Sequence, residues 1–377
     1  MEIQNSIKPD IKSLYRDEII YYLEKENQPR YRADQIVNWI YRHYASGWSE
    51  MSNLSLELRK KLPEIFNLYT SKLVKLQCAA DSTRKFLWQL EDGSFVESVL
   101  IPANPALYGE SSDRMTLCVS TQVGCAYRCK FCASGLNGFV RNLGAGEIVE
   151  QLLATERWAI SEKLNQNTSA TTARDRVISN VVFMGMGEPF ANYDNLLRAI
   201  KIINSEWGCN IGARKMTIST CGLAPEIRRF AAENMQVRLA ISLHGATDEV
   251  RSKLMPVNKK YPLAQLIEAL RFYKQNKSGM ITFEYILIEG INDSPEQAER
   301  LASIAKPLFA KVNLIPYNRV EGLDYKPSPL NIQKQFLNIL KRRGIAATLR
   351  REKGGEIDAA CGQLRLRTES ELKQGSI

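Results

Sequence analysis

The first part of the chain shows apolar residues at helical spacing. In the segment 31–44 the apolar positions lie three and four residues apart, which predicts an amphipathic helix. A second segment of this kind, 53–62, predicts a helix that ends before Pro63. The polar faces carry several Arg and Lys residues, which fit either a solvated surface or an RNA-contacting one. We therefore expect residues 1–70 to form a small helical accessory domain.

From residue 72 to residue 102 the pattern changes to alternation. Two alternating runs, 85–90 and 94–102, flank an Asp-Gly pair at 92–93, which predicts a β-hairpin. Glu97 shares one face of the second strand with Phe95 and Val99, and a carboxylate is unusual on such an apolar face. A solvent-facing edge is the alternative explanation. We assign the hairpin to an extension over residues 71–110.

Strands and helices alternate after about residue 113. Strand-like runs occupy 115–120, 177–185, 215–220, 236–244, 280–288 and 311–318. Helix-like runs occupy 146–160, 195–204, 225–234, 263–275 and 295–308. Six strands in such a series predict an α/β fold, a partial (β/α)6 barrel over residues 111–350. Its chemistry is expected at the carboxyl ends of the strands.

Two segments contain few apolar residues. The stretch 161–175 is expected to be a loop insertion, and the tail after Leu366 is expected to be disordered. The tail belongs to a C-terminal segment, 351–377, that follows the barrel.

Composition and charge narrow the class of protein. No run of apolar residues approaches a membrane-spanning length, and the first residues contain no apolar signal core, so a cytoplasmic location is expected. The 51 Lys and Arg residues exceed the 41 Asp and Glu residues, giving a formal charge of +10. A surplus of this size favours a polyanionic partner such as a nucleic acid.

The most informative motif is a group of three cysteines directly after the first barrel strand. Cys125, Cys129 and Cys132 lie within eight residues, and thiolates favour zinc or iron–sulfur clusters. A structural zinc needs four ligands, usually from paired CxxC units, and the chain has no second pair and only two histidines. Three thiolates can instead hold a [4Fe–4S] cluster with one iron left open for a ligand. A zinc-containing, non-catalytic RNA-binding protein remains the alternative.

Polar residues and glycines follow several later strands, at the end where a barrel binds its ligands. Gly187 and Glu188 follow one strand in the sequence GMGEP, where a glycine allows close backbone approach to a ligand. Further candidates end three other strands: Ser219, Ser242, His244 and Asn318. Each alone fits a capping or turn residue, and together they indicate a binding site.

The cysteine motif resembles the radical SAM superfamily, in which the open iron binds S-adenosylmethionine (SAM). The chain as a whole resembles the RlmN/Cfr family of ribosomal RNA adenine methyltransferases. The similar segments include 31–41, 96–102, 118–135, 181–196, 214–222, 239–258, 312–318 and 356–365. The last of these, EIDAACGQLR, and the pairing of Cys118 with the cysteine motif are the most specific.

The resemblance implies a role for each candidate. Cys125, Cys129 and Cys132 would bind one [4Fe–4S] cluster. SAM would contact Gly187, Glu188, Ser219, Ser242, His244 and Asn318. Cys361 would accept a methyl group from a first SAM, and a radical from a second would convert it to a methylene radical that adds to adenine. Cys118 would then release the product by forming a disulfide with Cys361, and Glu97 would accept a proton. Cys78, Cys209 and Cys221 are interpreted as packing residues.

The resemblance also implies a substrate. The family divides between methylation of adenine C2 and methylation of adenine C8, which confers antibiotic resistance, and Pro189 after GMGE favours the C2 branch. The implied substrates are an adenosine in the peptidyl-transferase region of 23S rRNA and the adenosine 3′ of the anticodon in some tRNAs. An electron donor such as flavodoxin is the expected partner, and the enzyme is expected to act as a monomer.

Overall fold

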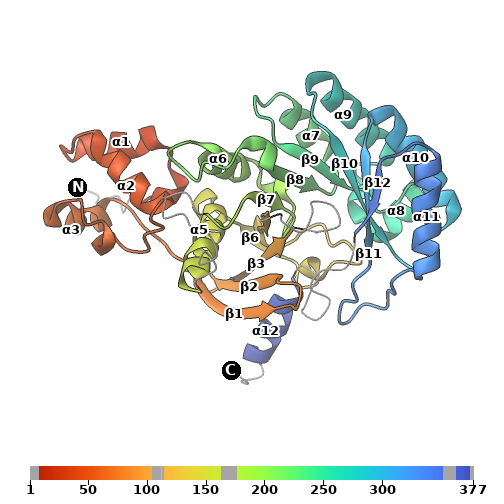
Figure 1. Ribbon diagram of the computed structural model, residues 1–377, viewed down its shortest axis with the longest axis horizontal. Helices are drawn as coiled ribbons and strands as arrows, with labels where there is room; N and C mark the ends of the chain where they lie inside the picture. Colours follow the sequence, from red (N-terminus) through yellow and green to blue (C-terminus); the bar gives the residue numbers. More distant parts are fainter. Residues whose placement is uncertain (1–7, 104–111, 113, 163–175, 351–361, 374–377) are drawn as a thin grey trace.

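The computed structural model describes residues 8–103, 112, 114–162, 176–350 and 362–373. A helical unit lies at one end of the molecule and a helix-covered sheet forms the rest (Figure 1). Most of the expected insertion 161–175 lies outside the described residues, as does Cys361. Within the described residues, the helices are all too short or too polar to cross a bilayer.

Three helices form the N-terminal unit: α1 (Arg16–Lys25), α2 (Tyr31–Tyr41) and α3 (Leu56–Ile65). The amphipathic pattern of the sequence is confirmed in α2, whose apolar face is buried. The helix α3 does not end before Pro63, as expected, but runs to Ile65. The proline lies in the last turns, where its missing N–H removes only one backbone hydrogen bond.

This helical unit packs against the rest of the chain through polar contacts as well as apolar ones. Lys12 forms an ion pair of 2.6 Å with Glu150, and both side chains are 1% exposed. Because a buried charge needs a partner, this pair fixes the start of the unit on the helix that carries Glu150, α5 (Ala145–Ser161). Arg198 adds an ion pair to Glu18 from α6 (Tyr193–Asn204).

One ten-stranded sheet runs through the molecule in the order β1-β2-β3-β4-β7-β8-β9-β10-β11-β12. Its parallel part contains the six expected strands, β4 (Met115–Cys118), β7 (Asn180–Phe183), β8 (Met216–Thr220), β9 (Arg238–Ser242), β10 (Ile281–Leu287) and β11 (Lys311–Pro316). A short strand that the sequence pattern did not indicate, β12 (Ala347–Leu349), pairs in parallel with β11.

Helices cover the outer face of the parallel strands (Figure 1). The expected helices are α5, α6, α7 (Ala224–Ala231), α9 (Leu263–Asn276) and α10 (Pro295–Ala305). Two more, α8 (Asp248–Leu254) and α11 (Leu330–Arg342), were not predicted. The partial barrel and its α/β class are confirmed.

The hairpin extension has three strands, where two were expected. β1 (Lys72–Cys78) pairs antiparallel with β2 (Arg84–Gln89), which pairs antiparallel with β3 (Phe95–Pro102). Because β3 also pairs antiparallel with β4, the extension continues the barrel sheet. A separate small sheet joins β5 (Gln122–Gly124) to β6 (Phe139–Asn142) and frames the cysteine loop.

The tail after Leu366 was expected to be disordered, but its described part is helical: α12 covers Gln363–Lys373. Leu364 is buried in an apolar cluster with Leu87 and Phe95 of the extension. Lys75 of β1 also forms an ion pair with Glu371. The prediction of disorder was wrong because this segment has few apolar residues of its own. Its helix is stabilised by contacts with Leu87 and Phe95, which lie far away in the sequence.

Candidate active site

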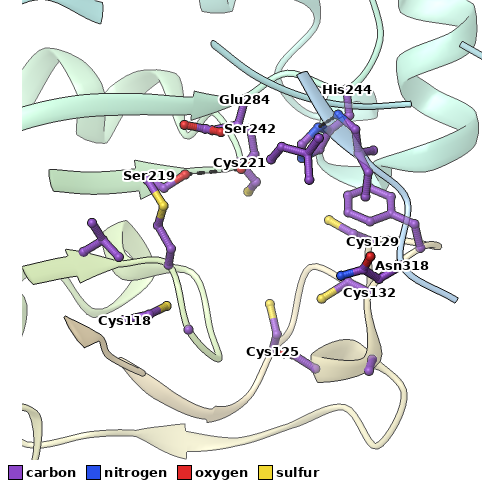
Figure 2. Close-up of a pocket in the computed structure, with 18 of the residues that line it drawn as sticks. Cys118, Cys125, Cys129, Cys132, Ser219, Cys221, Ser242, His244, Glu284 and Asn318 are labelled. Carbon is purple, nitrogen blue, oxygen red and sulfur yellow. Dashed lines mark hydrogen bonds between the residues drawn. The ribbon is translucent and has the colours of Figure 1, made fainter. Parts of the chain in front are cut away.

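A cavity of about 390 Å³ opens at the carboxyl ends of the parallel strands. Ten of the twelve site residues proposed from the sequence line it; Glu97 does not, and Cys361 lies outside the described residues. Figure 2 shows Cys118 on one wall, the thiols of Cys125, Cys129 and Cys132 on another, and Ser219 and Ser242 on a third. A space of this size is typical of small-molecule sites.

The cysteine loop is held by backbone contacts. The Cys125 N–H donates to the Gly138 carbonyl over 3.0 Å, and the Lys130 N–H donates to the Leu254 carbonyl over 2.8 Å. Gly124 has φ +76°, and a Cβ there would lie 2.0 Å from the Gly138 oxygen, so only glycine fits. The loop is therefore anchored at both β6 and the end of α8.

The three thiols are suited to an iron–sulfur cluster. Burial raises the pKa of the Cys125 thiol to about 12 and raises the pKa of Cys129 as well, so binding of a metal must displace their protons. Within the described residues, no three Cys, His, Asp or Glu side chains are placed to share one metal ion, as a structural zinc would need. A cubane makes a different demand, because each cysteine binds its own iron.

Glu188 ties two loops together at the edge of the cavity. Its side chain is 3% exposed, and its two carboxylate oxygens accept hydrogen bonds from the Phe190 N–H (3.0 Å) and the Cys221 N–H (2.7 Å). Gly187 has φ +97°, and a Cβ there would lie 2.5 Å from Cβ of Gln122. The loop after β7 is therefore restricted in its backbone conformation at Gly187, and each carboxylate oxygen of Glu188 already accepts a hydrogen bond.

His244 is held as a neutral imidazole. Its Nδ1 accepts the Ile286 N–H over 3.1 Å, so Nε2 carries the proton and is left as a donor for a ligand. Burial lowers the pKa of His244 to about 3, with a further contribution from Arg251. The ring also contacts Phe131 of the cysteine loop edge to face, at 4.8 Å between centroids.

This burial predicts a pH dependence of stability. Between about pH 6.5 and pH 3 the unfolded chain binds a proton at His244 that the folded chain does not. The free energy of unfolding is therefore highest, as far as His244 determines it, above pH 6.5, and it decreases as the pH falls through this window. Over most of that window the loss is about 1.4 kcal/mol per pH unit. His244→Asn keeps an acceptor for the Ile286 N–H and tolerates the φ of +55°. Urea unfolding at pH 5.5 and pH 7 should show a smaller pH effect in the variant; equal pH effects would contradict the buried neutral imidazole.

Glu97 does not line the cavity but lies beside the start of α12. Its carboxylate accepts the N–H groups of Gly362 and Arg365, each over 2.7 Å, and forms an ion pair of 2.9 Å with Lys85. The Glu97 and Lys85 side chains are 2% and 1% exposed. A carboxylate with these three donors stabilises the helix N-terminus and fixes Gly362. Its expected role as a proton acceptor remains a prediction.

The remaining cysteines differ in their surroundings. Cys118 is 6% exposed at the end of β4, and Cys209 is buried, as expected of a packing residue. Cys78 was also interpreted as a packing residue, but it is exposed. The expected disulfide between Cys118 and Cys361 is not supported by the structure: no two described cysteines are bonded to each other, and Cys361 lies outside the described residues.

Comparisons with known proteins identify the family. Residues 10–68 match the ribosomal RNA large subunit methyltransferase N-terminal domain, and residues 168–302 match the radical SAM superfamily. A probable dual-specificity RNA methyltransferase RlmN 3 from Opitutus terrae is 48% identical, covering 97% of this chain and 96% of that protein. A probable dual-specificity RNA methyltransferase RlmN from Akkermansia muciniphila is 49% identical, covering 96% and 97%. The chain belongs to the RlmN family.

A solved structure agrees with this family assignment. The crystal structure of a radical SAM methyltransferase from Sphaerobacter thermophilus is 41% identical and covers 94% of this chain and 98% of that one, with a TM-score of 0.86. The expected resemblance to RlmN proteins is thus confirmed. Membership of the radical SAM superfamily implies a [4Fe–4S] cluster and SAM.

Sequence reasoning missed several side chains that line the cavity of this RlmN-family protein, among them Cys221 and Glu284. Cys221, interpreted as a packing residue, lines the cavity beside Ser219 and Ser242 (Figure 2). Glu284 lines it from the middle of β10. A carboxylate within the apolar run 280–288 was the available signal for Glu284, because such a run predicts a strand buried on both faces.

Proposed function

We propose that this protein methylates C2 of adenine in RNA by radical SAM chemistry. The substrates are an adenosine in the peptidyl-transferase region of 23S rRNA and the adenosine 3′ of the anticodon in some tRNAs, and each cycle consumes two SAM molecules. The observation that supports the proposal most directly is that Cys118 lines the same cavity as the three thiols of the cysteine loop, those of Cys125, Cys129 and Cys132 (Figure 2).

The cluster and SAM have defined places in this proposal. Cys125, Cys129 and Cys132 hold one [4Fe–4S] cluster, which when bound supplies the electron that cleaves SAM to a 5′-deoxyadenosyl radical. The SAM contacts come from residues that line the cavity: Gly187, Glu188, Ser219, Ser242, His244 and Asn318. His244 contributes a neutral N–H donor, and Glu188 holds its own loop against the loop after β8.

Two further cysteines perform the transfer. The thiolate of Cys361 attacks the methyl carbon of the first SAM, so that a bond from the Cys361 sulfur to the methyl group forms and S-adenosylhomocysteine leaves. The 5′-deoxyadenosyl radical removes one hydrogen from the S-methyl group, and the resulting methylene radical adds to C2 of the adenine. The ring is restored when the adduct loses the C2 proton, for which Glu97 is the proposed acceptor, and one electron, which returns to the oxidised cluster. Cys118 then attacks the sulfur of Cys361, so that an S–S bond forms as the C–S bond breaks and the carbon takes up a proton.

Each part of the chain has its own role in this proposal. Residues 1–70 bind RNA, residues 71–110 extend the sheet, residues 111–350 form the catalytic barrel, and residues 351–377 carry Cys361. The formal charge of +10 and exposed cations such as Arg30 and Lys60 on the helical unit support contact with RNA phosphates. The protein acts in the cytoplasm as a monomer and takes electrons from a donor such as flavodoxin.

The experiment is methylation of defined RNAs followed by mass spectrometry. Anaerobically reconstituted protein, SAM and a reductant should add one methyl group to C2 of a single adenine in a 23S rRNA fragment, and also methylate a tRNA. The same RNAs with that adenine replaced by guanine serve as controls and should gain none. A methyl group at C8 would place the protein in the other branch of the RlmN/Cfr family. A colourless protein that holds one zinc and methylates neither RNA would refute the proposal.

A further inference from the structure

A row of polar side chains crosses the parallel sheet beneath the cavity. Ser242, Glu284, Asn313 and Thr348 are register partners on the adjacent strands β9, β10, β11 and β12. The Asn313 amide donates to Oε1 of Glu284 over 3.0 Å, and the Thr348 hydroxyl donates to Oδ1 of Asn313 over 2.7 Å. These hydrogen bonds orient the Glu284 carboxylate and leave its other oxygen, Oε2, without a bond from this row.

The second carboxylate oxygen of Glu284 is buried and receives no hydrogen bond from the described part of the chain. The residue is 6% exposed, and Oε2 has no hydrogen-bond partner among the described residues, although Glu284 lines the cavity. A buried carboxylate oxygen without a partner destabilises the fold, and one that faces a cavity is available to accept from a ligand. Burial raises the pKa of Glu284, and Arg350, which also lines the cavity, partly opposes this rise through its charge.

The position of Glu284 indicates which part of a ligand it meets. In Figure 2 it lies next to Ser242, across the cavity from Cys125 and Cys132. If the amino and carboxylate groups of SAM bind at the cluster, the nucleoside part is left to reach the wall formed by Ser219, Ser242 and Glu284. The hydroxyls of Ser219 and Ser242 lie 3.3 Å apart and extend the same polar wall. The ribose hydroxyls are the donors of the nucleoside that suit Oε2 best, because one carboxylate oxygen has two lone pairs and can accept from two adjacent hydroxyls.

We propose that Glu284 binds the ribose hydroxyls of SAM through its Oε2 atom. This inference rests on the proposed SAM site and adds to it a residue that determines affinity for the nucleoside. It makes a distinct prediction, because a residue that only supports the sheet would affect ligands with and without ribose hydroxyls equally.

The test measures binding, with no turnover. Isothermal titration calorimetry on the cluster-loaded, oxidised protein compares SAM with a SAM analogue that lacks both ribose hydroxyls. Glu284→Ala should raise the dissociation constant for SAM about tenfold or more, as expected for loss of two hydrogen bonds. The wild-type protein should lose a similar factor on the analogue, and the variant should bind the analogue as weakly as the wild type does.

Controls separate folding from binding. Glu284→Gln keeps an acceptor for the Asn313 amide, and it carries the test if the alanine variant loses iron or its near-ultraviolet circular dichroism. Glu289→Gln changes an exposed carboxylate just after the same strand and should bind SAM as the wild type does. An equal loss of affinity for SAM and for the analogue, or no loss, would overturn the ribose assignment alone. A wild-type protein that binds no SAM would overturn the proposed function with it.

Discussion

Replacing Cys118 by Ala is expected to yield protein that carries covalently attached RNA. The thiol of Cys118 lies at the end of β4, is 6% exposed and lines the same cavity as the cluster-type cysteines. If it breaks the bond between Cys361 and the methylated base, the variant still accepts a methyl group and adds to adenine. It then stalls, because no second thiol remains to attack the sulfur, and turnover stops within a single cycle. A denaturing gel with nuclease treatment, followed by peptide mass spectrometry, should find a nucleotide on Cys361.

Two variants control this experiment. Cys209→Ala removes a buried cysteine that does not line the cavity, so it should lose some stability and retain turnover. The double variant Cys118→Ala, Cys361→Ala should carry no RNA, because the methyl acceptor is absent. RNA-free Cys118→Ala protein with normal turnover would show that Cys118 only packs against the sheet.

Loss of any cluster cysteine is expected to abolish SAM cleavage. Cys125→Ala, Cys129→Ala and Cys132→Ala each leave a cubane with two protein ligands, which the loop holds poorly. Iron and sulfide analysis should fall well below the value of about four irons per chain expected for the wild-type protein. The brown colour and the production of 5′-deoxyadenosine should be lost together.

The matched control is Cys78→Ala, since Cys78 is exposed on β1, three strands along the sheet from β4, and does not line the cavity. This variant should keep its full iron content and activity. Any one of the three cysteine-loop variants that retains four irons and cleaves SAM at the wild-type rate would rule out the proposed ligand set.

The parallel strands were predictable because each is a short run rich in apolar residues that is followed by a loop and a helix-like segment. The predicted strand ends, such as Ser219 and Asn318, do line the cavity, because parallel strands bring their carboxyl ends to one edge of the sheet. The short strand β12 and helix α8 have too few residues to show a period, and the sequence pattern did not reveal them. The helix α12 was missed because its apolar partners, Leu87 and Phe95, belong to the extension.

The polar groups inside the fold were harder to interpret from sequence. Glu97 stood out on an apolar face, but its contacts with Lys85 and with the Gly362 N–H depend on chain segments that only the tertiary structure joins. Glu284 is a carboxylate in an otherwise apolar run, but its significance comes from one oxygen that lacks a donor among the described residues. Whether a buried polar atom has a hydrogen-bond partner depends on the tertiary structure.

The packing of α12 on the extension also sets the order in which the protein is completed during synthesis. Glu97 and Gly362 are 265 residues apart in the sequence. At roughly 5 to 20 residues per second, the ribosome takes on the order of 15 to 50 s to make the chain between them. Throughout that interval Leu87 and Phe95 lack their apolar partner, and the Lys85–Glu97 pair lacks two backbone donors. A chain that terminates before Gln363 keeps these groups uncovered permanently, which gives cellular proteases a way to recognise it.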